Sequence, residues 1–296
     1  MAKGAWAPRE HRVVRDELTK LQEGLRLWAR TFSVGNIADL QQVSSDQLDM
    51  VIEALNGYCV QKNWRSLAPQ IPIPPNRVPM VFIQALLAKS IFSDFTDPFL
   101  LLGHLDHDLK LPGKEEMQNL YQIMIRGNEA EAHVWRSQTL RVLSASANDT
   151  KLHLSRQLER VVNIQVAAFL SGPAHVLLRQ VKNNEEQQVR ASDLHKLYST
   201  AGTLALSLWT QRTYIVCRGV EPLQVFDSSD TEMTAHRFHH LDEDDNRLDG
   251  NPILVCVQPA VLAFGNENGE DYDKKKLWAK ATVLVAEDKM EQSVDW

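Results

Sequence analysis

The segment MVFIQALLAKSIFSDF, residues 80–95, places apolar side chains around nearly the whole circumference of a helix. A surface helix needs one apolar stripe, whereas a helix that is apolar on every side must be covered on every side. Pro79 suits the first turn of this helix, and Pro98 disfavours helical backbone at the preceding Asp97. We therefore predict a central helix at 80–95 that several other elements surround.

Other segments have the spacing of helices that bury one face against such a centre. Between residues 9 and 32, apolar side chains recur in alternating steps of four and three, which places them on one helical stripe. They are Val14, Leu18, Leu21, Leu25, Trp28 and Phe32. Ser44 and Gln47 have the spacing of a capping box, which predicts that a second helix begins there.

The chain from residue 114 to residue 209 is also predicted to be mostly helical. Residues 114–146 form one or two helices with a break at Gly127, and residues 149–170 form another. A polar loop at 182–188 then leads to a helix that Ser192 caps.

After about Arg212 the sequence becomes rich in β-branched and aromatic residues separated by turn residues, which is typical of strands. Strands are predicted at 213–218, 223–227, 252–265 and 277–286, with an interruption at Pro259 in the third. So few strands are not stable alone and should pack on the helices. The predicted fold class is mainly α: a multi-helix bundle over residues 1–212, with a small antiparallel β element over residues 213–296 packed on it as an α+β arrangement.

Composition restricts the class of protein. The chain has 296 residues and a formal net charge of −6, so the molecule as a whole repels nucleic acid and anionic lipid. Its three cysteines, Cys59, Cys217 and Cys256, are odd in number and far apart, which argues against a disulfide framework. The N-terminal residues contain no apolar signal segment, and the longest apolar runs are interrupted. We expect an intracellular protein of the cytoplasm or nucleus, without a membrane segment.

The stretch HRFHHLDEDD, residues 236–245, combines histidines with carboxylates. On a helix, His236 would share a face with His239 or His240, and two imidazoles on one face can begin a site for a divalent metal. Asp242 could add a third ligand, and further ligands could come from His104 and His107. The strongly hydrophilic, turn-forming sequence that follows favours a solvated surface loop over a metal site.

Complete catalytic signatures are absent from the sequence. His107 and Asp108 match the dyad of metal-dependent phosphohydrolases, but the preceding helix at 80–95 has no histidine to hold the metal. The chain contains no GxSxG, HExxH, Walker phosphate loop or GxGxxG motif. Cys217 and Cys256 fall within apolar strands, where a thiol stays protonated and inert.

Two other features indicate binding. Trp6 and Trp296 lie in terminal segments, where a tryptophan can contact a protein partner or the body of the chain. The first helix carries Arg12, Arg15, Arg26 and Arg30 mostly off its apolar stripe. A solvated basic face explains these arginines, and a nucleic-acid surface is the alternative.

Four segments together resemble a group of fungal proteins of unassigned function. They are ELTKLQEGLRLWAR (17–30), IQALLAKSIFSDFTDPF (83–99), VWRSQTLRVLS (134–144) and VCVQPAVLAFGNENGEDYD (255–273). The resemblance covers most of the chain and rests on general texture. It implies a helix-rich fold in a fungal intracellular setting, and it implies no activity, substrate or site residue.

These observations predict a protein–protein interaction, scaffold or regulatory module without catalytic activity, which binds a protein partner or a second copy of itself. The first alternative is a metal-dependent enzyme of hydrolase type that uses His236, His239 and Asp242. The second is a nucleic-acid-associated regulator that binds through the basic first helix. No cofactor is expected, apart from the divalent metal of the first alternative.

Overall fold

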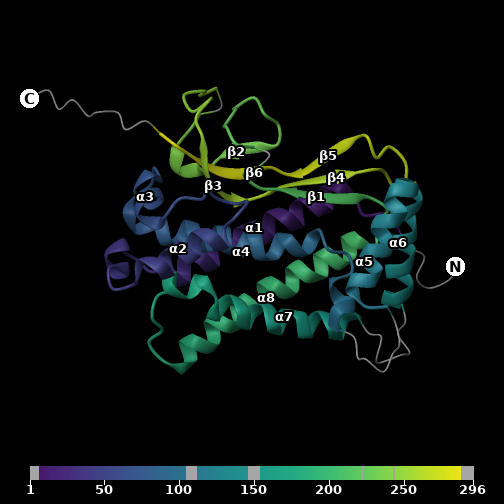
Figure 1. The fold of residues 1–296 in the computed structure, drawn as a ribbon, viewed down its shortest axis with the longest axis horizontal. Coiled ribbons are helices and arrows are strands. Elements are labelled where there is room, and N and C mark those ends of the chain that lie inside the picture. The colour runs from purple at the N-terminus through teal and green to yellow at the C-terminus, as the bar shows by residue number, and fades with distance from the viewer. Residues whose placement is uncertain (1–6, 105–111, 146–153, 222, 243, 288–296) are drawn as a thin grey trace, which may run out of the picture.

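The computed structural model describes residues 7–104, 112–145, 154–221, 223–242 and 244–287. In this part of the chain the helices form one layer and the strands form a second layer that lies across it (Figure 1). The fold is mainly α with a small β part near the C-terminus, so the predicted class is confirmed.

Helix α4, Val78–Phe95, lies at the centre of the helical layer. Only Lys89, Ser90, Ser93 and Asp94 escape burial along its length. Among the described residues, Pro75–Phe95 is the one helical segment long and apolar enough to span a membrane, and 78% of its most apolar part is buried inside the protein. This burial is that of a central helix, as the sequence predicts.

Two helices from the N-terminal part of the chain lie against this centre. Helix α1, His11–Phe32, packs on α4 and buries the whole predicted stripe from Val14 to Phe32. Helix α2, Ser45–Ala54, begins with the predicted capping box, in which the Ser44 and Gln47 side chains bond each other's backbone N–H groups. The short helix α3, Trp64–Leu67, follows, and the proline-rich segment forms 3₁₀ turns at Ala68–Gln70 and Pro75–Arg77.

The remaining helices confirm one predicted break and correct one predicted start. Helices α5, Lys114–Gly127, and α6, Glu129–Ala145, separate at Asn128, and α7 spans Leu154–Ser171. Helix α8, Asn184–Trp209, begins eight residues before the predicted cap at Ser192. The side chain of Asn183 caps it instead by accepting from the Glu186 N–H, and two glutamates in its first turn favour the helix dipole.

The strands form a long bent hairpin with one additional strand on each side. Strands β3, Ile253–Gln258, and β4, Ala260–Phe264, continue each other across Pro259, as do β5, Lys275–Ala279, and β6, Ala281–Val285, across Lys280. Strand β3 pairs with β6 and β4 pairs with β5, both antiparallel. Strand β1, Tyr214–Arg218, pairs antiparallel with β4.

Two details of the β part differ from the prediction. Residues 223–227 make only an isolated bridge, Val225 to Pro252, so the predicted strand there is wrong. Strand β2, Met233–Ala235, was not predicted, and it pairs parallel to β6. A strand of three residues is too short for alternation to show in the sequence, and its parallel pairing makes the β part mixed.

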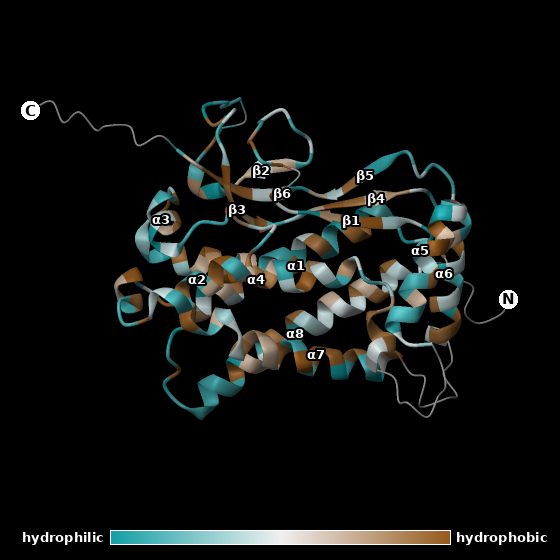
Figure 2. Cartoon of the chain, viewed as in Figure 1, coloured by the Kyte–Doolittle hydropathy of each residue, from teal (hydrophilic) through white to brown (hydrophobic). Residues whose placement is uncertain are grey.

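The two faces of the sheet are covered differently. Leu254 and Val257 of β3 belong to the large core shared with the helices, while Ile253 and Cys256 pack in a smaller cluster on the other side. Phe226, Met233 and Leu248, from the connections between strands, complete that smaller cluster. Figure 2 shows the hydrophobic residues along β3, β4 and β6 that both clusters require. Phe226 and Leu248 therefore anchor the connections between strands on the outer face of the sheet.

Candidate functional site

The HRFHH segment lies at the end of β2, where it is part of the sheet and not part of a long helix. The His236 N–H donates to the Val283 carbonyl oxygen at 2.7 Å, which extends the pairing of β2 with β6. A single 3₁₀ turn, Arg237–His239, follows, and His240 ends it in the left-handed region with φ of 49°. The predicted α-helical face of histidines is therefore not formed.

His239 is held by the last described strand. Its Nε2 accepts from the Val285 N–H at 3.1 Å, so the hydrogen of the neutral ring is on Nδ1, which lies 2.5 Å from a Glu287 carboxylate oxygen. Burial lowers the pKa of His239, although the carboxylate of Glu287 opposes this shift. Both ring nitrogens are used within the fold.

His236 is also buried, and it caps the turn. Its Nδ1 accepts from the Phe238 N–H at 3.3 Å, and its ring centroid lies 4.7 Å from that of Phe238. Burial and the neighbouring charge of Arg237 lower the pKa of His236 to about 4, so the ring is neutral at physiological pH. The predicted solvated loop is thus wrong for His236 and His239, which are only 4% and 2% exposed.

The other predicted ligands do not join these histidines in the described part of the chain. Asp242 is exposed, and no group of three His, Cys, Asp or Glu side chains among the described residues could hold a metal ion. His104 ends the 3₁₀ turn Leu100–His104, with a side chain outside the description. His107, Trp6 and Trp296 lie outside the described residues.

The turn holds Arg237 in a basic surface. The guanidinium carbon of Arg237 lies 5.6 Å from the centre of the Phe238 ring, a distance typical of a cation–π contact. Partial burial lowers the pKa of Arg237, and the positive charges of Arg26, Arg30 and Arg77 lower it further. Three arginines from two other regions of the chain thus act by charge on Arg237. We call these four arginines the arginine cluster.

Each member of the cluster comes from an element with a fixed position. Arg26 and Arg30 are four residues apart on α1, so their side chains leave the helix on the same face. Arg77 ends the 3₁₀ turn that leads into α4, and Arg237 begins the turn after β2. The cluster thus lies where the helical layer meets the outer part of the sheet.

No member of the cluster has a carboxylate partner among the described residues. No described carboxylate lies within 4.0 Å of their guanidinium groups, and no hydrogen bond joins these guanidinium groups to a described residue. Some other arginines are paired with carboxylates, as in Arg9 with Glu17 and Arg218 with Glu232, whereas others, such as Arg65, are not. In a chain with 38 acidic and 32 basic residues, four arginines without an ion-paired carboxylate among the described residues concentrate positive charge locally.

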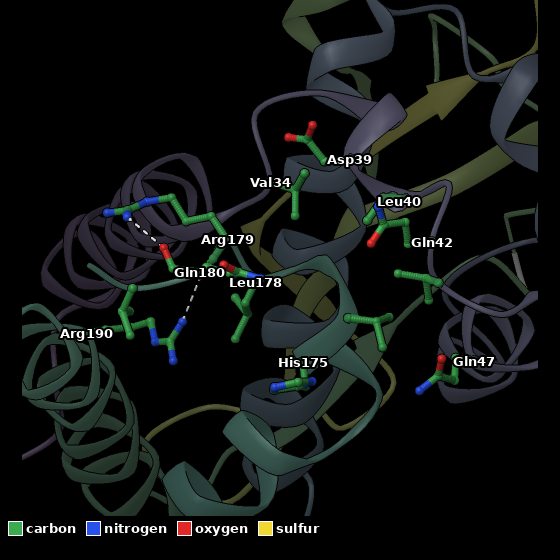
Figure 3. A pocket seen from close by; sticks show the side chains of 13 residues that line it. Val34, Asp39, Leu40, Gln42, Gln47, His175, Leu178, Arg179, Gln180 and Arg190 are labelled. Atoms are coloured by element: carbon green, nitrogen blue, oxygen red, sulfur yellow. Dashed lines mark hydrogen bonds between the residues drawn. The ribbon is translucent and has the colours of Figure 1, made fainter. Parts of the chain in front are cut away.

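A large cleft elsewhere is lined by Asp39 and His175 and by no described serine, threonine or cysteine. It has a volume of about 930 Å³ and lies between the segment 175–181, the beginning of α2 and Arg190 (Figure 3). Arg179 donates to the Thr31 carbonyl oxygen, and Arg190 donates to the Arg179 carbonyl oxygen at 3.2 Å. No serine, threonine or cysteine lines the cleft, so it offers no side-chain nucleophile of these types.

The cysteines are inert, as the sequence predicts for Cys217 and Cys256. Burial raises the pKa of Cys59, Cys217 and Cys256 to about 12 in each case. A thiol with such a pKa is protonated at neutral pH and is a poor nucleophile.

The fold defines a class, a helix-rich α+β protein, and the arginine cluster is a basic feature of it. Comparison with protein-family models, with curated proteins and with solved structures gives no match. The resemblance to fungal proteins therefore stays a prediction. Sequence analysis finds two members of the cluster, Arg26 and Arg30, from their spacing on α1. It misses Arg77 and Arg237, because no local pattern indicates that they lie beside α1.

Proposed function

We propose that this protein is a non-catalytic interaction module of the cytoplasm or nucleus, which binds an acidic segment of a protein partner through the arginine cluster. The observation that carries the proposal is the gathering of four arginines without a carboxylate partner among the described residues. The planar guanidinium donates two parallel hydrogen bonds to a carboxylate or phosphate, so arginines suit this type of partner.

The structural support of Arg237 also favours a binding role. Like-charged groups repel one another, so a cluster of arginines costs free energy unless a partner neutralises it. The chain nevertheless holds Arg237 in place, because Phe238 lies beneath its guanidinium and His239 is bonded to β6 and Glu287. A position maintained against its own electrostatic cost is typical of functional sites.

An acidic protein segment suits the cluster better than a nucleic acid does. Arg26 and Arg30 are one helical turn apart, and the cluster provides four charges. Nucleic-acid binding needs basic groups along an extended backbone, and the net charge of −6 opposes a long polyanion. A short acidic segment needs only the local charge.

The test is fluorescence anisotropy with a labelled oligoglutamate peptide and a phosphoserine peptide. The double variant Arg26→Gln with Arg237→Gln should weaken binding about tenfold or more, which corresponds to about 1.4 kcal/mol. The control Arg12→Gln with Arg65→Gln removes two exposed arginines outside the cluster and should bind as the parent does.

Two outcomes would reject the proposal. The first is equal weakening by both double variants, which would indicate general charge attraction and no specific site. The second is preferential binding of a single-stranded oligonucleotide, with a strong salt dependence that the cluster variant abolishes. That result would assign the same arginines to nucleic-acid recognition.

A further inference from the structure

A second group of polar side chains lies at the opposite end of α1, where the helix meets β5. The Trp278 indole N–H donates to His11 Nδ1 at 2.9 Å, and the Lys276 ammonium nitrogen lies 3.0 Å from His11 Nε2. Arg15, one turn further along α1, donates from Nε to the Leu277 carbonyl oxygen at 3.2 Å. Contacts with β5 thus fix the side chains of His11 and Arg15.

This group has more hydrogen-bond donors than acceptors. An indole N–H only donates, so His11 Nδ1 must accept, and the single hydrogen of the neutral imidazole is then on Nε2. A lysine ammonium also only donates. Partial burial, Lys276 and Arg15 all lower the pKa of His11, so the neutral ring is the relevant form. Two donors, His11 Nε2–H and Lys276 Nζ–H, therefore face each other across 3.0 Å. An oxygen that accepts from both would satisfy them.

The two donor residues lie in the wall of a cleft. His11 and Lys276 line a space of about 520 Å³ between the beginning of α1, the end of α8 and residues 266–268 of the hairpin loop. Val14, Leu208 and Trp278 add apolar wall, so the cleft can hold more than a bare ion. Its volume falls within the roughly 300–1,000 Å³ range of small-molecule sites.

The charges around His11 favour an anion. Lys276 and Arg15 act on His11 as positive charges, and Glu267 is the one negative charge that acts on it appreciably among the described residues. The cleft is lined by the basic residues Arg9, Arg212 and Lys276 and by the acidic residues Glu10 and Glu267, and Arg9 is paired with Glu17 at 2.7 Å. The direct contacts to an anion would come from the Lys276 ammonium and the His11 donor.

We infer that this cleft binds a phosphate monoester, with phosphate oxygens accepting from His11 Nε2–H and Lys276 Nζ–H and the organic group lying against Trp278. This site is distinct from the arginine cluster. Arg26 is fifteen residues from His11 along α1, which corresponds to about 22 Å of helix. The inference therefore does not depend on the proposed function.

The test is isothermal titration calorimetry of the whole chain with phenyl phosphate, and with benzoate as the matched carboxylate. Lys276→Met should weaken phenyl phosphate binding about tenfold, because it removes one donor and one charge from an exposed position. Lys280→Met removes a lysine that is equally exposed and that does not line the cleft, so it should bind as the parent does. His11→Phe keeps the ring packed near Trp278 and should also weaken binding.

Three results would overturn the inference. One is the absence of phenyl phosphate binding to the folded parent at millimolar concentration. The second is equal binding by the parent and Lys276→Met, with unchanged thermal unfolding to show that both are folded. The third is tighter binding of benzoate than of phenyl phosphate, which would reject the phosphate assignment.

Discussion

Nδ1 of His133 lies 2.5 Å from the hydroxyl oxygen of Tyr121, and the His133 ring stacks on Tyr214 with an interplanar angle of 15°. Tyr121 belongs to α5, His133 to α6 and Tyr214 to β1, so one fully buried imidazole joins two helices to the sheet. Burial raises the pKa of Tyr121 to about 12, so its hydroxyl keeps its hydrogen and donates to His133.

This buried histidine predicts an acid-sensitive fold. Burial and the charge of Arg136 lower the pKa of His133 from 6.5 to about 3. Between these values the unfolded chain takes up a proton that the folded chain does not, so stability is full above about pH 6.5 and falls as the pH decreases toward 3. For one histidine the loss between pH 7.5 and pH 5 is roughly 2 kcal/mol.

Replacement of the histidine should reduce that dependence. His133→Gln should lower the free energy of unfolding at pH 7.5 by about 1–3 kcal/mol, because it removes the ring stacking. Its further loss on acidification to pH 5 should be smaller than that of the parent by roughly 2 kcal/mol. Urea denaturation at both pH values measures the two effects. An identical pH dependence in parent and variant would contradict the assigned role.

The corrected start of α8 gives a second prediction. Asn183 accepts from the Glu186 N–H at 2.8 Å, whereas Ser192 lies exposed within the helix. Asn183→Ala should lower the free energy of unfolding by about 1 kcal/mol, because the first turn loses its cap. Ser192→Ala should change it by less than about 0.5 kcal/mol in either direction. Thermal unfolding of the pair measures the difference, and the reverse order of effects would restore the sequence-based cap.

These results show which structural features the sequence determines locally. The stripe on α1, the apolar circumference of α4 and the break at Pro259 follow from spacing over a few residues, and all three were predicted correctly. The start of α8 was missed because two residues, Asn183 and Ser192, satisfy the same capping rule. Position within the fold decides between them.

The candidate site depended on contacts that spacing does not encode. The histidine spacing in HRFHH fits a helix, but pairing of β2 with β6 places the segment on a sheet and buries both predicted ligands. Arg77 and Arg237 are 160 positions apart in the sequence and meet α1 only through packing of the two layers. The second group, His11 with Lys276, is likewise brought together by β5 crossing α1.

Glu287 gives a third prediction, which links the buried histidines to binding. Its carboxylate accepts from His239, and the His239 carbonyl oxygen accepts from Arg247. Glu287→Ala leaves a buried donor without its acceptor and should lower the free energy of unfolding by about 1–2 kcal/mol, while Glu287→Gln keeps an acceptor oxygen and should cost less. Both variants remove the same negative charge. Weaker oligoglutamate binding by Glu287→Ala than by Glu287→Gln would therefore show that the bond to His239 keeps Arg237 in its binding position. Equal binding by the two variants would contradict this role of Glu287.

The arginine cluster itself predicts a conflict between stability and binding. Arg77 acts on Arg237 by charge repulsion, and its guanidinium has no hydrogen-bonded or ion-paired partner among the described residues. Arg77→Gln should therefore raise the free energy of unfolding by a few tenths of a kcal/mol at low ionic strength, and salt should diminish the gain because it screens the repulsion. The same change should weaken binding of an oligoglutamate peptide several-fold.

Arg65→Gln, at an exposed arginine of α3, is the matched control and should affect neither stability nor peptide binding. Destabilisation of more than about 1 kcal/mol by Arg77→Gln would indicate that this guanidinium supports the fold. Unchanged stability with unchanged peptide binding would remove Arg77 from the cluster.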